Sequence, residues 1–158
     1  MFDSPTYLPL IGFIVANFIV AMSGAFFRPG AWYDTLSKPS WIPPSWLFGP
    51  VWMVLYGMNA VAGWLVWQKV GLDIAVFAIY GAQLLLNALW SALFFGMRRL
   101  RTALYEMIGL WLALVVNIAV FYPIDAVAGW LIVPYLLWVS FAFILNLVMV
   151  RLNPSVAT

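Results

Sequence analysis

Carboxamide and indole side chains recur at helical spacing within an apolar stretch near the middle of the chain. Gln83 and Asn87 are four residues apart and Trp90 follows three residues later, which places all three on one face of a helix. Carboxamides in an apolar environment are costly unless they are hydrogen-bonded. A face that combines them with an indole ring suits hydrogen bonding to, and stacking on, a flat and mostly apolar ligand.

Two further stretches repeat this combination of rings and amides. The first consists of Trp52, Tyr56, Asn59 and Gly63, and the second of Pro134, Trp138, Ala142 and Asn146 beside Tyr135, all at steps of three or four residues. Because lipid does not satisfy amides, we expect the three faces to converge inside a helix bundle. For any single amide, including Asn17 and Asn117, an interhelical hydrogen bond of about 0.6–2 kcal/mol is the simpler interpretation. The aromatic rings on the same faces favour a shared pocket.

The residues available for other chemistry are few. The chain contains no cysteine and no histidine, which excludes disulfides, thiolate metal sites and strong axial ligation of a haem iron. We therefore predict no metal site and no obligatory cofactor. Acid–base groups are sparse: Asp3, Asp34, Asp73 and Asp125 occupy segment ends and loops, and Glu106, about one turn inside an apolar segment, is expected to pair with a nearby arginine.

The composition indicates an integral membrane protein. Of 158 residues, 66% are hydrophobic and 8% are charged, whereas soluble domains are about 45–50% apolar and about 25% charged. Five apolar segments are long enough to cross a bilayer: Tyr7–Phe27, Leu47–Gln68, Ile74–Met97, Thr102–Tyr122 and Ala126–Val150. The last three connectors are very short, so neighbouring helices must run antiparallel. We predict one all-α domain over residues 1–158, a bundle of five transmembrane helices.

The basic residues predict the orientation of the bundle. With five spans, six cations fall on one side, namely Arg28, Lys38, Arg98, Arg99, Arg101 and Arg151, and Lys69 falls on the other. The positive-inside rule makes the first side cytoplasmic. We expect an extracytoplasmic N-terminus and a cytoplasmic C-terminus. The opening MFDSPTYLPL lacks a basic region and a cleavage pattern, so the first helix is expected to remain.

The long connector from Arg28 to Trp46 is rich in tryptophan and proline. Disordered segments are poor in aromatic residues, and prolines restrict the backbone, so we predict a long ordered loop that forms a folded cap. Trp46, at the start of the second segment, fits an aromatic belt at the membrane interface. Trp32 and Trp41 fit a lid over the mouth of the bundle. Lys38, with Arg28, is then placed to meet the carboxylates of an amphipathic ligand.

Several blocks resemble one known family over nearly the whole chain. They are WYDTLSKPSWIPPSW in the loop, GPVWMVLY in the second segment, QLLLNALWSALFFG in the third and PYLLWVSFAFILN in the fifth. They resemble the family of tryptophan-rich sensory proteins and translocator proteins (TspO/MBR), also called peripheral-type benzodiazepine receptors. The resemblance implies a five-helix membrane receptor of a bacterial cell membrane, a homodimer, that binds protoporphyrin IX, sterols and benzodiazepine-site ligands.

The resemblance also implies a pocket under the first loop. Its ligand-binding residues are implied to be Trp32, Tyr33, Trp52, Tyr56, Gln83, Asn87, Trp90, Trp138, Ala142 and Asn146. The charge of the loop adds Lys38 to this set of predicted ligand-binding residues. The family's sterol motif is altered, because Asn146 is followed by Leu147 where the motif has tyrosine, although Arg151 is retained. That motif is weak in any case, and sterol binding is in doubt.

Three functions follow from these observations. The favoured one is a binding protein that senses or handles porphyrins, metal-free ones in particular. An alternative is an enzyme that degrades porphyrin in the presence of light or oxidant, in which Trp52 and Trp138 would be the reacting residues. A porphyrin or sterol transporter is less favoured, because five spans do not divide into equal inverted repeats and Glu106 is the one evident intramembrane carboxylate.

Overall fold

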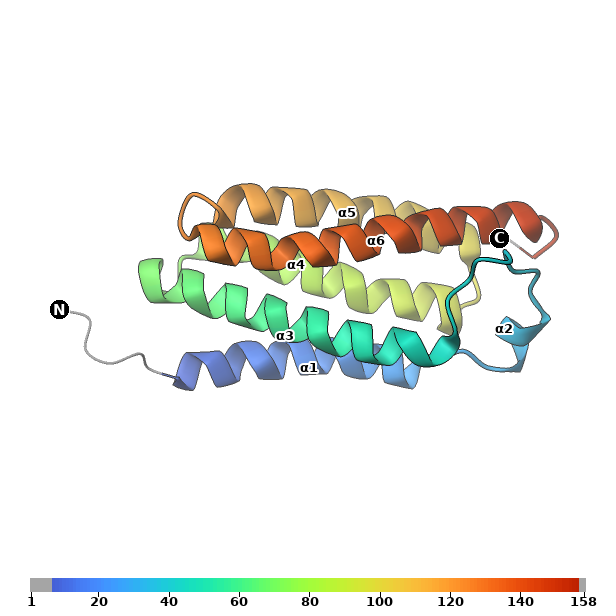
Figure 1. The fold of residues 1–158 in the computed structure, drawn as a ribbon, viewed down its shortest axis with the longest axis horizontal. Coiled ribbons are helices and arrows are strands. Elements are labelled where there is room, and N and C mark those ends of the chain that lie inside the picture. Colours follow the sequence, from blue (N-terminus) through green and yellow to red (C-terminus); the bar gives the residue numbers. More distant parts are fainter. Residues whose placement is uncertain (1–6, 157–158) are drawn as a thin grey trace.

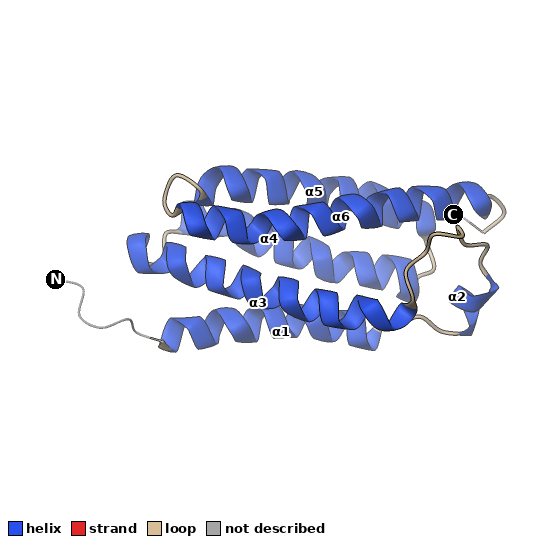
Figure 2. Cartoon of the chain, viewed as in Figure 1, coloured by secondary structure: helices blue, strands red, loops and turns tan. Residues whose placement is uncertain are grey.

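The computed structural model describes residues 7–156, and its ordered elements in that range are helices (Figures 1 and 2). They are α1 (Leu8–Phe26), α2 (Ala31–Thr35), α3 (Ser45–Val70), α4 (Ile74–Ser91), the π-helix η1 (Ala92–Gly96), α5 (Leu100–Phe121) and α6 (Ala126–Leu152). Asp3 and the other residues before Tyr7, on which the expectation about the N-terminal segment depends, lie outside the described residues.

The long helices form a closed ring. α1 packs against α3 and α4, α3 packs against α6, α6 against α5, and α5 against α4. Figure 1 shows these helices side by side, with α2 and the C-terminal end at one end of the bundle and the start of α1 at the other. The five spans α1, α3, α4 with η1, α5 and α6 are long and apolar enough to cross a membrane, which confirms the predicted all-α five-helix membrane protein.

Short polar signals end the helices and fold the chain back on itself. Asp73 caps the start of α4 by accepting hydrogen bonds from the backbone amides of Ala75 (2.9 Å) and Val76 (3.2 Å). Asp125 accepts one from Ala128 N (2.9 Å) at the start of α6. Such caps satisfy amides that have no partner within the helix. Gly71 ends α3 with a φ of 67°, a conformation that favours glycine.

Buried amides join α1, α3 and α4 in the half of the bundle distant from α2. Asn17 donates to the Tyr80 hydroxyl (2.7 Å) and accepts from Asn59 Nδ2 (2.9 Å). The Tyr80 hydroxyl in turn donates to Asn59 O (3.0 Å). Interhelical hydrogen bonds of this kind stabilise helix contacts in lipid. The structural interpretation of Asn17 is therefore confirmed.

The end of the third span departs from the predicted continuous helix. Residues Ala92–Gly96 form a π-helix, in which Met97 N bonds to Ala92 O at 2.8 Å. A π-helical turn holds an extra residue, so the side chains that follow it are rotated from their α-helical positions. Gly96 lies against the Phe27 ring, where a Cβ would come within 2.7 Å of a ring carbon. The sequence analysis did not predict this irregular turn.

The close approach of α6 to the end of α5 generates a prediction about stability. A Cβ added at Gly129 would lie 2.9 Å from the Tyr122 backbone Cα, which cannot move without shifting the turn. We expect Gly129→Ala to lower the free energy of unfolding in detergent by about 1–3 kcal/mol. Gly12→Ala in α1 is the matched control, because a Cβ there meets no atom within 4 Å. An equal effect of the two substitutions would contradict the packing described.

Candidate functional site

A hydrogen-bonded bridge connects three helices across the interior of the ring. The Tyr56 hydroxyl of α3 donates to Asn87 Oδ1 of α4 at 2.9 Å. Asn87 Nδ2 donates to the hydroxyl of Tyr135 on α6. Tyr135 is fully buried and Asn87 is 3% exposed. The structure thus brings one polar side chain from each of the three predicted stretches to a common height.

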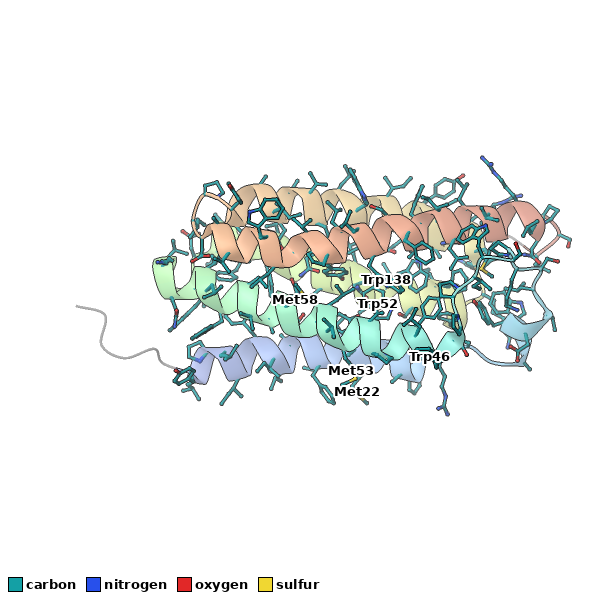
Figure 3. All side chains as sticks on the ribbon, viewed as in Figure 1. Met22, Trp46, Trp52, Met53, Met58 and Trp138 are labelled. Carbon is teal, nitrogen blue, oxygen red and sulfur yellow. The ribbon has the colours of Figure 1, made fainter. Side chains whose placement is uncertain are left out.

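Aromatic rings surround this bridge toward the α2 end of the bundle. The Trp52 ring stacks on Tyr56 with centroids 5.4 Å apart and meets the edge of Tyr135 at 5.7 Å. The Trp138 ring contacts Phe48 at 5.8 Å. In Figure 3, Trp52 and Trp138 lie between the ribbons of α3 and α6, whereas Met53, which is 75% exposed, lies on the opposite side of α3. The predicted convergence of Trp52, Tyr56 and Trp138 is therefore present.

Several buried polar atoms near these rings have no hydrogen-bonding partner in the structure. They are the indole nitrogens of Trp90 and Trp138 and both side-chain amide atoms of Gln83. Most buried polar groups in proteins are paired, so each exception calls for an explanation. The two indole N–H groups are donors, and the Gln83 amide offers both a donor and an acceptor. These atoms can pair with polar atoms of a bound molecule or with water.

The remaining amides are used differently. Asn59 bonds to Asn17 and not to the bridge. Asn146 lies against α5. With its amide turned to suit these neighbours, Nδ2 donates to Leu100 O (3.2 Å) and Oδ1 accepts from Leu104 N (3.3 Å). Asn117 is fully buried and neither of its side-chain polar atoms has a partner, so the expected interhelical bond is not formed. The ligand-binding roles of Asn146 and of Ala142, which packs in the core, stay predictions.

The expected pairing of Glu106 with an arginine is wrong. Both carboxyl oxygens are buried and neither has a hydrogen-bonding partner. Ala103 and Leu110, three residues before it and four residues after it, are both buried, so Glu106 lies on the face of α5 that turns toward the bundle. The arginines of this region, Arg98, Arg99 and Arg101, lie at or before the start of α5 and do not reach it.

The connector between α1 and α3 covers the end of the bundle. We call residues 28–44 the lid, because Trp46 already belongs to α3. Trp32 contacts Phe94 with centroids 6.4 Å apart, and Tyr33 contacts Phe95 at 5.6 Å. The π-helix therefore carries two of the rings that the lid contacts. The lid is ordered and packed, with Leu36 only 6% exposed.

Cations in and beside the lid lie against aromatic faces. Lys38 Nζ is 4.6 Å from the centre of the Tyr33 ring and donates to Leu36 O at 3.3 Å. The Arg98 guanidinium lies 5.9 Å from the centre of the Trp32 ring. Cation–π contacts of this kind contribute about 0.5–1 kcal/mol at exposed sites. Burial, and to a lesser extent the Asp34 carboxylate, raise the pKa of the Tyr33 hydroxyl, so this group remains protonated at neutral pH.

Two grooves open on the outer surface of the bundle. One of about 410 Å³ lies between α5 and α6, where Trp111 Nε1 donates to Ser140 Oγ at 2.9 Å. The other, of about 400 Å³, is lined by α1, α4 and the end of α3. Neither groove is lined by a predicted ligand-binding residue. The interior site is instead filled by its own rings, which pack against one another beneath the lid.

Sequence reasoning missed several residues of this site. Phe48, Phe94 and Phe95 contact Trp138, Trp32 and Tyr33, yet an apolar phenylalanine in an apolar segment carries no distinguishing signal. Phe94 and Phe95 also depend on the π-helix, which periodicity does not reveal. Asn153 was missed as well, although an asparagine just after a long apolar segment is a common helix-ending signal.

The fold and the interior define a class: a helical membrane protein whose interior, beneath a folded lid, is lined by aromatic and amide side chains. Comparison with known proteins gives its family. The profile of the TspO/MBR family matches residues 12–152. The chain is 42% identical to the tryptophan-rich sensory protein of Cereibacter sphaeroides over 141 residues, 89% of each chain. It is 34% identical to the translocator protein of Homo sapiens over 150 residues, 90% of this chain and 89% of that one. It also resembles protein CrtK of Rhodobacter capsulatus, with 37% identity over 146 residues, 90% of this chain and 91% of that one.

The chain therefore belongs to the TspO/MBR family. The resemblance of the sequence blocks to tryptophan-rich sensory proteins and translocator proteins is confirmed.

The bridge predicts a coupling between Tyr56 and Asn87. Asn87→Ala leaves two buried hydroxyls without their partner, so we expect it to lower the free energy of unfolding by about 1–3 kcal/mol. Tyr56→Phe alone should cost about 1 kcal/mol. In the Asn87→Ala background it should cost nothing or recover part of the loss, because it then removes a buried hydroxyl that has no partner. The free energies of unfolding of the wild type, the two single variants and the double variant, measured by reversible unfolding in mixed micelles, complete this double-mutant cycle.

The control for the cycle is Tyr105→Phe, which removes a hydroxyl from a side chain 69% exposed on α5. It should leave stability within about 0.5 kcal/mol of the wild type. Strictly additive losses for Tyr56→Phe and Asn87→Ala would show that the bridge does not connect the helices as described.

Proposed function

We propose that the protein binds porphyrins such as protoporphyrin IX, and flat benzodiazepine-site ligands, in the interior site beneath the lid. The observation that carries the proposal is that the buried indole N–H groups of Trp90 and Trp138 have no partner although both rings pack among other aromatic rings. The buried Gln83 amide, one turn from Asn87 on α4, has no partner either. Binding sites for small molecules combine apolar walls with a few polar groups that orient the ligand.

The chemistry of these walls matches a planar ring system. Trp52, Tyr56 and Trp138 offer flat faces and edges to their neighbours in the site, and offset or edge-on ring contacts are favourable. In the described state these rings pack on one another. A planar ligand that inserts between them replaces ring–ring contacts with ring–ligand contacts, so little apolar contact is lost on binding.

The charge at the lid end matches the carboxylates of a porphyrin. Lys38 belongs to the lid, and Arg98 lies beside it with its guanidinium over Trp32. Both cations can exchange an aromatic contact for a charge-assisted hydrogen bond to a carboxylate, which is about twice as strong as a neutral one. A porphyrin would then lie with its ring inward and its propionates toward the lid.

The proposal is tested by quenching of tryptophan fluorescence on titration with protoporphyrin IX. Trp138→Ala removes a wall of the site and an unpartnered donor, and Asn87→Ala removes the centre of the bridge. We expect each to raise the dissociation constant by about tenfold, the equivalent of about 1.4 kcal/mol. Trp138→Phe keeps a ring and loses the N–H, so its dissociation constant should lie between those of the wild type and Trp138→Ala.

The matched control is Trp130→Ala. Trp130 is 64% exposed on the lipid-facing side of α6, so its removal subtracts a fluorophore without touching the site, and the dissociation constant should not change. Equal affinities for the wild type, Asn87→Ala and Trp138→Ala would assign those side chains to the scaffold. The interior site would then not be the place where porphyrin binds.

We further propose that the lid end of the bundle is cytoplasmic. Six of the seven Lys and Arg residues belong to the lid end by the order of the helices, and Lys69, near the end of α3, belongs to the other. The positive-inside rule then gives an extracytoplasmic N-terminus and a cytoplasmic C-terminus.

The absence of cysteine makes this orientation testable with single thiols. Ser40 lies exposed in the lid, and Leu72 is 76% exposed between α3 and α4. We expect Leu72→Cys to react with a membrane-impermeant maleimide added to intact cells, and Ser40→Cys to react only after the membrane is permeabilised. The reverse pattern would mean that the bundle is inserted the other way round.

A further inference from the structure

Asn153, at the end of α6, holds the backbone of the lid through both ends of its carboxamide. Asn153 Oδ1 accepts from Ser37 N at 2.8 Å, and Asn153 Nδ2 donates to Ser37 O at 2.9 Å. The same Nδ2 donates to Met149 O at 2.8 Å, within α6. The amide is thus fixed on its own helix while it pairs with both polar groups of one lid residue 116 positions away.

This contact differs from the others that the lid makes. Its other contacts with the bundle are apolar, ring and cation contacts, which tolerate sliding, such as the Leu36 cluster and Trp41 against Phe141 at 5.9 Å. Among residues 7–156, the two hydrogen bonds between Asn153 and Ser37 are the ones that join the lid to α4, α5 or α6. Hydrogen bonds have strict distances and angles, so this pair fixes the position of the lid where the ring contacts do not.

The α6 side of this contact is sheltered from solvent. Asn153 is 8% exposed, and the lid residues on either side of Ser37 and Lys38 are Leu36, at 6%, and the buried Pro39. Leu36 packs in a cluster with Leu93, Phe94, Leu100 and Met149. Releasing Ser37 from Asn153 would therefore free the segment of the lid whose side chains reach into the bundle.

We propose that Asn153 is a positioning residue that keeps the lid closed over the interior site and so sets the rate at which ligand leaves. It contacts the lid and not the ligand. The inference rests on the proposed function for its ligand, but the closure of the lid by Asn153 stands independently of any ligand. Loss of the amide leaves the interior rings in place and increases the time that the lid spends open.

The experiment uses the full chain, which has no native cysteine. Leu36→Cys places a thiol under the lid, and its rate of reaction with a maleimide in the ligand-free protein reports lid opening. We expect Asn153→Ala to raise that rate by about tenfold or more, since two hydrogen bonds are lost. Asn153→Asp keeps the acceptor for Ser37 N but loses the donor, and should give an intermediate rate.

Two controls separate lid opening from general loosening. Ser40→Cys, already exposed in the lid, should react equally fast with and without the Asn153→Ala substitution. Leu152→Ala, a truncation of the neighbouring residue that is 45% exposed, should leave the Leu36→Cys rate unchanged. An unchanged Leu36→Cys rate in both Asn153 variants would overturn the proposal, whether or not porphyrin binds.

Ligand exchange is the second readout. The dissociation rate of protoporphyrin IX, followed by recovery of tryptophan fluorescence, should increase by about tenfold in Asn153→Ala. If Asn153→Ala speeds the thiol reaction but leaves the dissociation rate unchanged, the proposal that the lid sets the rate of ligand release is wrong. Failure of the wild type to bind protoporphyrin would count against the proposed function, and the thiol rates would still decide whether Asn153 closes the lid.

Discussion

The bridge from Tyr56 through Asn87 to Tyr135 is the interaction on which the rest of the structure depends. In a membrane no water is available to satisfy a buried amide or hydroxyl, so such groups must find one another. Here they do so from α3, α4 and α6, which are not all adjacent in the ring. The pairing fixes the relative heights of these helices. Trp52 and Trp138, about a turn away along α3 and α6, are thereby brought to one level.

The same constraint explains why the polar atoms without partners are informative. Asn17, Tyr80 and the Nδ2 group of Asn59 pair with one another, whereas Asn59 Oδ1 is buried without a partner. The indole nitrogens of Trp90 and Trp138 stay unpaired close to the lid. Trp90 contacts Phe94 and Phe95, and Trp138 contacts Phe48 and Phe141, so these two unpaired donors lie among aromatic rings. Among the described residues, Gln83 and Asn117 are unpaired amides that the ring contacts do not explain.

The sequence predicted the five spans because periodicity and length are strong signals in a membrane, where every span must be apolar and about as long as the bilayer is thick. It also predicted that Tyr56, Asn87 and Trp138 face inward, since lipid rejects amides. It did not predict which amide pairs with which: Asn59 and Asn146 have the same spacing as Asn87, yet they bond elsewhere. The π-helix and the Asn153 contact depend on packing between distant segments, and a single sequence carries no measure of such contacts. The prediction that Glu106 pairs with an arginine was wrong for a related reason. The arginines are near Glu106 in the sequence, but their charged groups are not near its carboxylate in the fold.

The route to the interior site follows from the distribution of polarity. Around the ring the helices are in contact and present apolar surface to lipid, so a carboxylated ligand that entered between them would have to desolvate its charges. At the lid end Lys38 and Arg98 can pair with those charges. The contacts to be broken there are the cation–π pair of Arg98 with Trp32, a few ring contacts, the packing of Leu36 and the two hydrogen bonds of Asn153. Each of these is weaker than the cost of burying an unpaired carboxylate in hydrocarbon. For the proposed porphyrin ligand, displacement of the lid is therefore the lower-energy path of entry, and it would leave the bridge among Tyr56, Asn87 and Tyr135 intact.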